Sequence, residues 1–218
     1  MPPAPTVKSS SRLTGSRPLA YGSSCDLRNP PVVPTLRPAN KADLPALAQL
    51  ADIATRDLLG PFLNPAQRRH ASTFTPFDPW LITDGTYFVV ELDGVIRASG
   101  GWSRRPSLIH QSTPEAEYPK PDPSGTARIR AMYTEPIYAR RGLGRVILSV
   151  CEVSARLSGH HRLELLATPV GKFLYLSCGF ETLECKKLQV DEGVTYSVFR
   201  MQKFLHRKEP GPSNTSSV

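Results

Sequence analysis

The chain of 218 residues is long enough for one domain with flanking tails and a substantial core. Its formal net charge of +8 lies mainly at the ends, because residues 1–38 contribute +4, residues 203–218 contribute +2 and residues 39–202 only +2. Basic tails are more often solvated extensions than nucleic-acid binders, so we do not expect nucleic acid as the main ligand. No apolar run approaches the length that spans a membrane, so we expect a soluble protein without a membrane partner.

The cysteines and histidines form no pattern typical of a disulfide framework or a metal site. The four cysteines lack Cys-x-x-Cys spacing: Cys25, Cys151, Cys178 and Cys185. Cys151 and Cys178 belong to predicted helices, where we expect small buried thiols in a reducing compartment. His160-His161 has no cysteine or carboxylate at ligand spacing, so we expect a surface turn and no metal. Because we expect these thiols to be reduced, we expect a cytoplasmic location.

Residues 1–31 are rich in proline, serine, arginine and glycine, and we interpret them as a disordered extension. Because Asp26 is their first acidic residue, an organellar presequence is an alternative, but the prolines oppose an amphipathic helix. Residues 32–205 form the predicted domain, and residues 206–218 a second disordered tail.

The first predicted elements of the domain are a strand and a helix. A strand over residues 32–37 leads to Asn40, whose side chain suits the N-cap of a helix over residues 41–59. Apolar residues repeat along one face of that helix, and Gly60-Pro61 ends it.

A second helix and a hairpin follow. Asn64-Pro65 predicts the start of a shorter helix that runs toward Phe74. Residues 87–97 are typical of a β-hairpin with Asp93-Gly94 as its turn. The connection over residues 103–126 is long and proline-rich, so we interpret it either as a flap over a ligand site or as a passive surface insertion.

The next strand, over residues 127–133, runs into a turn with two glycines and three arginines, and a helix follows at once. Backbone N–H groups at a helix start lie at the positive end of the helix dipole and form a ready anion site. Glycine lets a phosphate approach the backbone, and arginine adds charge and forked donors. We therefore predict a phosphate site in a turn made of Arg140, Arg141, Gly142, Leu143, Gly144 and Arg145.

Two common phosphate motifs do not fit this turn. A dinucleotide fingerprint needs a third glycine where Ile147 stands, and a P-loop needs Lys-Ser/Thr where the chain has Arg145 and Val146. What remains is a strand, a Gly-x-Gly turn and a helix. This pattern is equally compatible with a helix start that binds no ligand.

The segments after the turn sharpen this interpretation. The helix ends at Gly159, and its predicted buried stripe comprises Leu143, Val146, Ile147, Val150, Val153 or Ser154, and Leu157. A strand over residues 162–168 follows, and Thr168 with Pro169 predicts the start of a short helix. Cys178-Gly179-Phe180 closes that helix, and strands over residues 182–189 and 194–201 form a final antiparallel pair.

In this order of elements the chain resembles the GNAT superfamily of acyl-CoA-dependent N-acetyltransferases. Residues 140–144 resemble the family's pyrophosphate-binding loop, and residues 174–180 resemble its "Tyr-three-residues-Gly-Phe" element. The loop departs from the family's pattern at Ala139, where Gln or Arg is usual. The resemblance implies an α/β fold with a mixed, mostly antiparallel central sheet of six to seven strands and helices on both faces.

The resemblance also implies the residues that bind acetyl-CoA. The pantetheine arm would lie along Met132, Tyr133 and Thr134, and a backbone N–H of this strand would polarise the thioester carbonyl. Backbone groups of residues 141–145 would hold the pyrophosphate. The side chains of Arg140, Arg141 and Arg145 would either meet outer phosphates or face solvent. Thr168 would hydrogen-bond the pantetheine, cap its helix, or do both.

Tyr175 is the predicted general acid that protonates the departing thiolate, and a purely packing role is the alternative. The general base is open: Glu91, His110 and Glu135 are candidates, and a deprotonated amine needs none. Arg128 and Arg130 share one face of their strand. We interpret them as surface residues, although they would favour an acidic acceptor if they lined its slot.

The sequence thus predicts an enzyme that moves an acetyl group from acetyl-CoA, as co-substrate, to an amine of a small molecule or peptide in a ternary complex. No covalent nucleophile is evident, since no Gly-x-Ser-x-Gly occurs. The alternative is a CoA-binding sensor or interaction module of the same fold without catalysis. We expect a monomer or homodimer.

Overall fold

The computed structural model describes residues 33–71, 80–106 and 122–205. The two predicted tails, His110, Phe74 and most of the predicted flap lie outside these residues.

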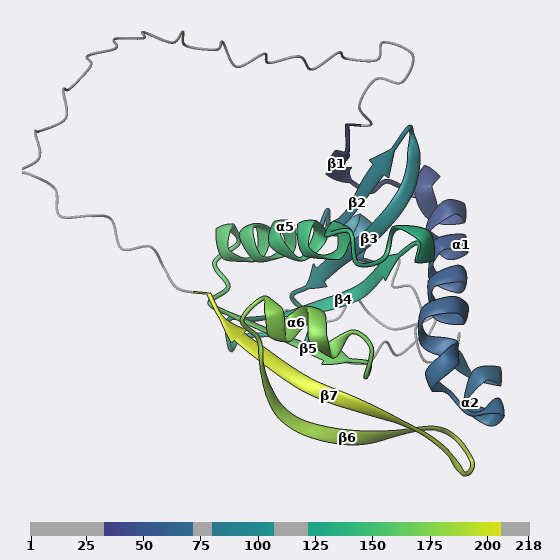
Figure 1. Ribbon diagram of the computed structural model, residues 1–218. Helices are drawn as coiled ribbons and strands as arrows, with labels where there is room; N and C mark the ends of the chain where they lie inside the picture. The colour runs from purple at the N-terminus through teal and green to yellow at the C-terminus, as the bar shows by residue number, and fades with distance from the viewer. Residues whose placement is uncertain (1–32, 72–79, 107–121, 206–218) are drawn as a thin grey trace, which may run out of the picture. The chain divides into compact units, whose positions relative to one another are not determined.

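The described strands form one sheet of seven, in the order β1-β2-β3-β4-β5-β7-β6 (Figure 1). Only β4 and β5 pair in parallel, and every other neighbouring pair is antiparallel. The predicted mixed, mostly antiparallel sheet is therefore confirmed. The strands are β1 (Thr35–Pro38), β2 (Tyr87–Leu92), β3 (Val95–Ser103), β4 (Thr126–Thr134), β5 (Arg162–Ala167), β6 (Glu181–Asp191) and β7 (Val194–Phe204).

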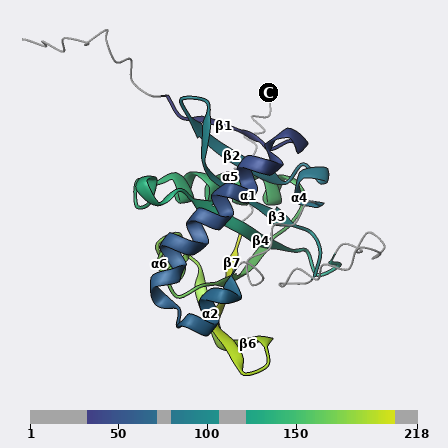
Figure 2. The same ribbon diagram turned by 90° about the vertical axis from the view of Figure 1, so that its right-hand side faces the viewer.

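Helices lie on both faces of this sheet, as predicted. Figures 1 and 2 show α1 on one face and α5 on the other. Leu50 and Ala54 of α1 pack with Tyr133 of β4, while Ile147 and Cys151 of α5 belong to the larger core on the opposite face. The α-helices are α1 (Leu44–Ala54), α2 (Pro65–Arg69), α4 (Trp80–Thr83), α5 (Leu143–Leu157) and α6 (Lys172–Ser177).

The helix predicted over residues 41–59 is divided into three parts. A 3-10 turn (Lys41–Asp43) precedes α1, and a π turn (Thr55–Leu59) follows it. Pro45 stands in the first turn of α1, where a missing N–H breaks no intrahelical bond. The predicted cap at Asn40 is confirmed, because its side chain accepts a hydrogen bond from the Ala42 N–H.

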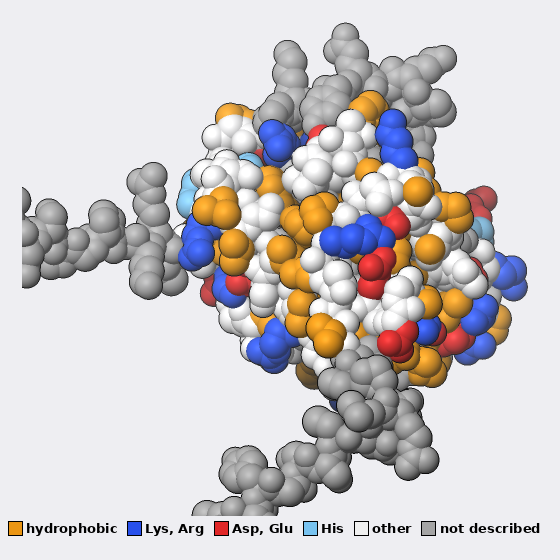
Figure 3. All heavy atoms as spheres, turned by 90° about the horizontal axis from the view of Figure 1, so that it is seen from above, with side chains coloured by type: hydrophobic (Ala, Val, Ile, Leu, Met, Phe, Trp, Pro, Cys, Tyr) orange, Lys and Arg blue, Asp and Glu red, His pale blue; other side chains and the backbone are white. Residues whose placement is uncertain are grey.

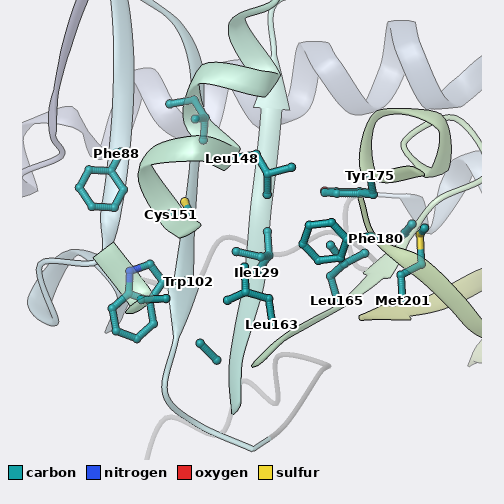
Figure 4. Close-up of a cluster of buried hydrophobic side chains, with 14 of the residues drawn as sticks. Phe88, Trp102, Ile129, Leu148, Cys151, Leu163, Leu165, Tyr175, Phe180 and Met201 are labelled. Atoms are coloured by element: carbon teal, nitrogen blue, oxygen red, sulfur yellow. The ribbon is translucent and has the colours of Figure 1, made fainter. Parts of the chain in front are cut away.

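The larger core fills the space between α5, α6 and the sheet (Figure 4). Trp102 is almost fully buried, and its indole N–H donates to Ser154 Oγ at 3.0 Å. In Figure 4, Phe88 and Trp102 lie on one side of this core, and Tyr175 and Phe180 on the other.

The buried stripe predicted for α5 is partly wrong. Leu143 and Ile147 are buried as expected, and Ser154, the predicted alternative to the exposed Val153, is half-buried. Val146 and Leu157, however, are 43% and 80% exposed. The helix turns its small residues Cys151 and Ala155 toward the sheet instead, which lets the two approach closely. Figure 3 shows hydrophobic side chains among charged ones on the face of the protein seen from above.

The β6–β7 hairpin is longer than predicted and reaches α2. Tyr196 of β7 packs with Leu59, Leu63 and Ala71, and its hydroxyl donates to the backbone carbonyl of Gln67. The Gln67 side-chain amide donates in turn to the Thr195 carbonyl at 2.7 Å. The hairpin therefore packs on α2 beyond the point where β7 leaves β5.

Candidate functional site

The candidate site begins where β4 and β5 diverge. These strands pair only from Thr126 to Arg128 on β4 and from Arg162 to Glu164 on β5. Beyond that point β5 continues to pair with β7 as far as Ala167, while β4 continues beside β3 as far as Thr134. In the described sheet, the ends of β4 and β5 thus have no pairing with each other, and their backbone groups border a gap.

A β-bulge lies in β4 beside this gap. Ser99 pairs with Tyr133 and Gly101 with Arg130, so Ala131 and Met132 both stand opposite Gly100. Ala131 has a φ of 49°, which is rare for a residue with a side chain. Gly100 makes room for the bulge, because a Cβ there would lie 2.2 Å from Met132 Sδ.

The side chains of the predicted pantetheine strand are engaged inside the protein. Met132 packs against the larger core, and Tyr133 is buried beside α1. Thr134 approaches α5, since a Cβ on Gly144 would lie 3.7 Å from Thr134 Oγ1. The strand can therefore offer a ligand mainly its backbone.

A 3-10 turn and the Gly-x-Gly turn connect this strand to α5. After a 3-10 turn (Pro136–Tyr138), Arg140 and Gly142 adopt positive φ angles of 64° and 91°. The N–H groups of Arg145 and Val146 both donate to the Gly142 carbonyl. The N–H groups of Leu143 and Gly144 precede these bonds and stand at the positive end of the helix dipole.

The three arginines of the turn are exposed, and two of them contact different neighbours. The Arg141 guanidinium lies 5.5 Å from the centre of the Tyr138 ring. Arg145 donates to Ser177 Oγ on α6 at 3.0 Å. No described contact gathers these side chains around one point, so their predicted phosphate contacts stay predictions.

Tyr175 lies on α6, which packs beside the start of α5. A Cβ on Gly144 would lie 3.2 Å from Leu174 Cδ2, the residue before Tyr175. Tyr175 is 7% exposed, and its ring meets Phe180 edge-on with the ring centres 5.7 Å apart. Burial raises the pKa of the Tyr175 phenol above its usual range, so the phenol is protonated at neutral pH but is a weaker acid than an exposed tyrosine.

Thr168 caps the helical turn that leads into α6. Its Oγ1 accepts a hydrogen bond from the Gly171 N–H at 3.1 Å, and its carbonyl accepts one from the Lys172 N–H at 3.0 Å. The helix itself begins at Lys172, with Gly171 at the N-cap position and no side-chain cap bond of its own. The predicted side-chain cap at Thr168 is therefore present, but the regular helix begins later than predicted.

The candidate bases are held by arginines where the structure describes them. Glu91 accepts hydrogen bonds from Arg37, with 3.1 Å between Arg37 Nε and Glu91 Oε1. Glu135 follows β4 directly and pairs with Arg97 at 2.5 Å. Neither carboxylate is thus free to take a proton without giving up an ion pair.

The expectation that Arg128 is a surface residue is wrong. Arg128 is 7% exposed and donates to Asp122 Oδ2 at 2.7 Å. Its Nε lies 3.9 Å from the buried carboxylate of Glu164, which Arg200 also contacts at 3.0 Å. The Arg128 charge is therefore compensated within the protein, which weakens the case for an acidic acceptor. Arg130, on the same face, is half-buried.

The remaining predicted groups are two cysteines and a histidine. Cys151 is buried as expected, and burial raises the pKa of its thiol, while Cys178 is only half-buried. His160 is not a pure surface residue, because it is half-buried with its ring 5.1 Å from that of Trp102. Within the described ranges, no helix is long and apolar enough to cross a membrane, and no group of three or more His, Cys, Asp or Glu is placed to hold a metal.

Sequence reasoning did not predict the gap or the bulge. The only local signal was Gly100-Gly101 inside a predicted strand, since glycine in a strand often marks a bulge or a close backbone approach.

Comparison with known proteins connects this geometry to one group of proteins. The model of the acetyltransferase (GNAT) family matches residues 47–180. None of the curated proteins matches this chain.

Solved structures share the fold. A GCN5-related N-acetyltransferase of Rhodopseudomonas palustris is 17% identical with a TM-score of 0.59, over 79% of this chain and 96% of that one. A ribosomal-protein-alanine N-acetyltransferase of Brucella melitensis is 23% identical with a TM-score of 0.55, over 78% and 99%. PaiA N-acetyltransferase of Thermoplasma acidophilum, solved in complex with coenzyme A, is 15% identical with a TM-score of 0.54, over 79% and 99%. At these identities the likeness concerns the fold alone.

Proposed function

This chain belongs to the GNAT family of acetyltransferases, and on that premise we propose that it transfers an acetyl group from acetyl-CoA to an amine of a small molecule or peptide by direct attack in a ternary complex. The observation that carries the proposal is the gap between β4 and β5, which opens beside the start of α5 and the helix that bears Tyr175.

The coenzyme would bind along β4 and at the start of α5. The backbone of Met132, Tyr133 and Thr134 would face the pantetheine arm, because their side chains are used for packing or approach α5. The pyrophosphate would meet the N–H groups of the turn made by Arg141, Gly142, Leu143, Gly144 and Arg145. The exposed Arg140, Arg141 and Arg145 side chains would add positive charge around it. Thr168, where β5 ends, would contact the arm from the other side of the gap.

In the proposed reaction, the amine nitrogen attacks the thioester carbonyl carbon and the carbon–sulfur bond breaks. A backbone N–H of β4 would stabilise the charge on the carbonyl oxygen. Tyr175 would donate its proton to the departing thiolate. Ordinary pKa values of about 10 for a phenol and about 8.5 for a thiol make this transfer uphill. Burial raises the pKa of Tyr175 further, so the transfer requires that the thiolate is desolvated in the same site and becomes more basic too.

The proton of the attacking amine would leave to solvent, and no side chain is assigned as general base. One observation favours the rival function of a CoA-binding sensor: Glu91 and Glu135 are both occupied by arginines. The position of α6, which carries Tyr175 beside the start of α5, favours turnover instead. The free thiols of Cys151, Cys178 and Cys185 support the proposed cytoplasmic location.

Release of free CoA thiol from acetyl-CoA, measured across a panel of amines, tests the function. We expect at least one amine to give turnover, and Tyr175→Phe to lower kcat by about 10- to 100-fold with little change in acetyl-CoA affinity. Tyr196→Phe is the matched control, because it removes a buried hydroxyl away from the gap and should keep kcat. Binding of acetyl-CoA without thiol release for any amine would establish the sensor instead.

A further inference from the structure

Tyr87 connects three neighbouring strands beneath the bulge. It belongs to β2 and is fully buried, and its hydroxyl lies 2.8 Å from the Ala131 carbonyl oxygen and 3.0 Å from Ser99 Oγ. A carbonyl oxygen can only accept, so the phenol donates its one hydrogen to Ala131 and accepts from the Ser99 hydroxyl. The hydrogen bond that Tyr87 donates therefore reaches the backbone of the bulge itself.

The Tyr87 ring reaches β4 because β3 has no side chain in its way. Tyr87 pairs with Gly101, and a Cβ on Gly101 would lie 2.6 Å from Tyr87 Cδ2. On the opposite face Gly100 leaves room for Met132 in the same manner. Gly101 thus leaves room for the Tyr87 ring, and Gly100 leaves room for the Met132 side chain.

The bond from Tyr87 determines the direction of one peptide group. The structure has no cis peptide bond in its described part, so the Met132 N–H points opposite to the Ala131 carbonyl, away from Tyr87. Ala131 keeps a left-handed φ of 49° that a residue with a Cβ avoids without outside support. The buried hydroxyl of Tyr87 supplies that support from another strand.

We propose that Tyr87, with Ser99, is a positioning residue for acetyl transfer: it holds the Ala131–Met132 peptide so that the backbone of β4 presents its donors to the thioester. This inference rests on the proposed function. Tyr87 itself is fully buried behind β4 and acts only through the peptide.

The test replaces Tyr87 by Phe, which removes the hydroxyl and keeps the ring. We expect kcat to fall about tenfold, while KM for acetyl-CoA stays within about twofold, because the phosphate contacts are unchanged. Tyr196→Phe is the control, since it also removes a buried hydroxyl that donates to a backbone carbonyl, that of Gln67. If the loss of a buried hydrogen bond acted only by destabilising the fold, kcat would fall equally in both variants.

A rescue variant separates positioning from packing. Glycine tolerates the left-handed conformation without help, so Ala131→Gly should restore part of kcat in the Tyr87→Phe background. Loss of kcat without this recovery, or an equal loss in Tyr196→Phe, would overturn the positioning role.

Amide hydrogen exchange measures the same effect without turnover. We expect the amides of Met132, Tyr133 and Thr134 to exchange faster in Tyr87→Phe than in wild type, and at the wild-type rate in Tyr196→Phe. Unchanged exchange would overturn the role of Tyr87 whether or not the protein acetylates an amine. Faster exchange in a protein that never releases thiol would leave Tyr87 as the support of the bulge and refute acetyl transfer.

Discussion

The helix start at Asn40 and the start of α5 at Gly142 differ in where their backbone donors go. Asn40 Oδ1 accepts from the Ala42 N–H at 2.8 Å, and Asp43 Oδ2 accepts from the Asn40 N–H at 2.8 Å. Gly142 has no side-chain cap bond, and the first turn of α5 contains no acidic residue. The first start uses its donors within the protein, whereas the second leaves them available to an outside anion.

This difference separates a helix start capped by side chains from one that we propose binds a ligand. The start of α2 belongs to the first kind, because Asn64 and Gln67 form the same reciprocal cap at 2.9 Å in both bonds. Only α5 among these three begins with a left-handed glycine that keeps side chains away from the donors. Substitutions at the two kinds of start should therefore affect different measurements.

The largest effect is expected from Gly142→Asp. A carboxylate at the start of α5 would compete with the pyrophosphate for the backbone donors, so acetyl-CoA affinity should fall by at least about 100-fold. Titration calorimetry measures this affinity. Gly193→Asp is the matched control, because Gly193 also has a positive φ and open space around it but lies in the β6–β7 turn. Wild-type affinity in Gly142→Asp would place the coenzyme elsewhere.

Asn40→Ala is expected to have a smaller effect, on stability and not on acetyl-CoA affinity. Loss of the cap should lower the free energy of unfolding by about 1 kcal/mol, measured by denaturant titration. Acetyl-CoA affinity should stay within about twofold, since no donor of α5 changes. If Asn40→Ala weakened acetyl-CoA binding as strongly as Gly142→Asp does, the two helix starts would not have separate roles.

The smallest effect is a pH dependence at the capped start. The pKa of Asp43 is lowered in the folded protein, chiefly by hydrogen bonds from Arg37 and also by the Asn40 N–H. Its carboxylate therefore stabilises the fold above the unfolded pKa of about 3.9, and this contribution is lost as the pH falls through the lower folded value.

Asp43→Asn tests this dependence. The difference from wild type in the free energy of unfolding should be constant from about pH 8 to about pH 5 and shrink below about pH 4. Asp93→Asn, at the exposed β2–β3 turn, is the control for a carboxylate without such bonds to arginine. A difference that does not vary with pH would show that the Asp43 charge contributes nothing to the capped start.

Elements built from residues close in sequence were predictable. Asn40 with Asp43 and Asn64 with Gln67 each act over three positions, and both caps are present. Asp93 and Gly94 both adopt positive φ, as a two-residue hairpin turn requires. The order of strand, Gly-x-Gly turn, helix, strand and short helix was likewise readable, because each element has its own local signal.

Which stripe of α5 is buried was not predictable, because Val146 and Cys151 are both apolar and only contact with the sheet selects between them. The same holds for Arg128, whose burial depends on Asp122 and Glu164 being brought beside it. From its charge and its position in the sequence alone, Arg128 was expected at the surface, because arginine is rarely buried without a partner.

The amino-acid sequence by itself determined the family, the caps at Asn40 and Asn64, the turns and the position of the proposed anion site, because these depend on a residue and its near neighbours. Only the tertiary structure decided the gap between β4 and β5 and the bulge at Ala131. The bulge depends on Tyr87, 44 positions away in the sequence, and on glycines in a third strand that admit both side chains. Contacts over such distances arise from packing of the whole sheet, which no local pattern encodes.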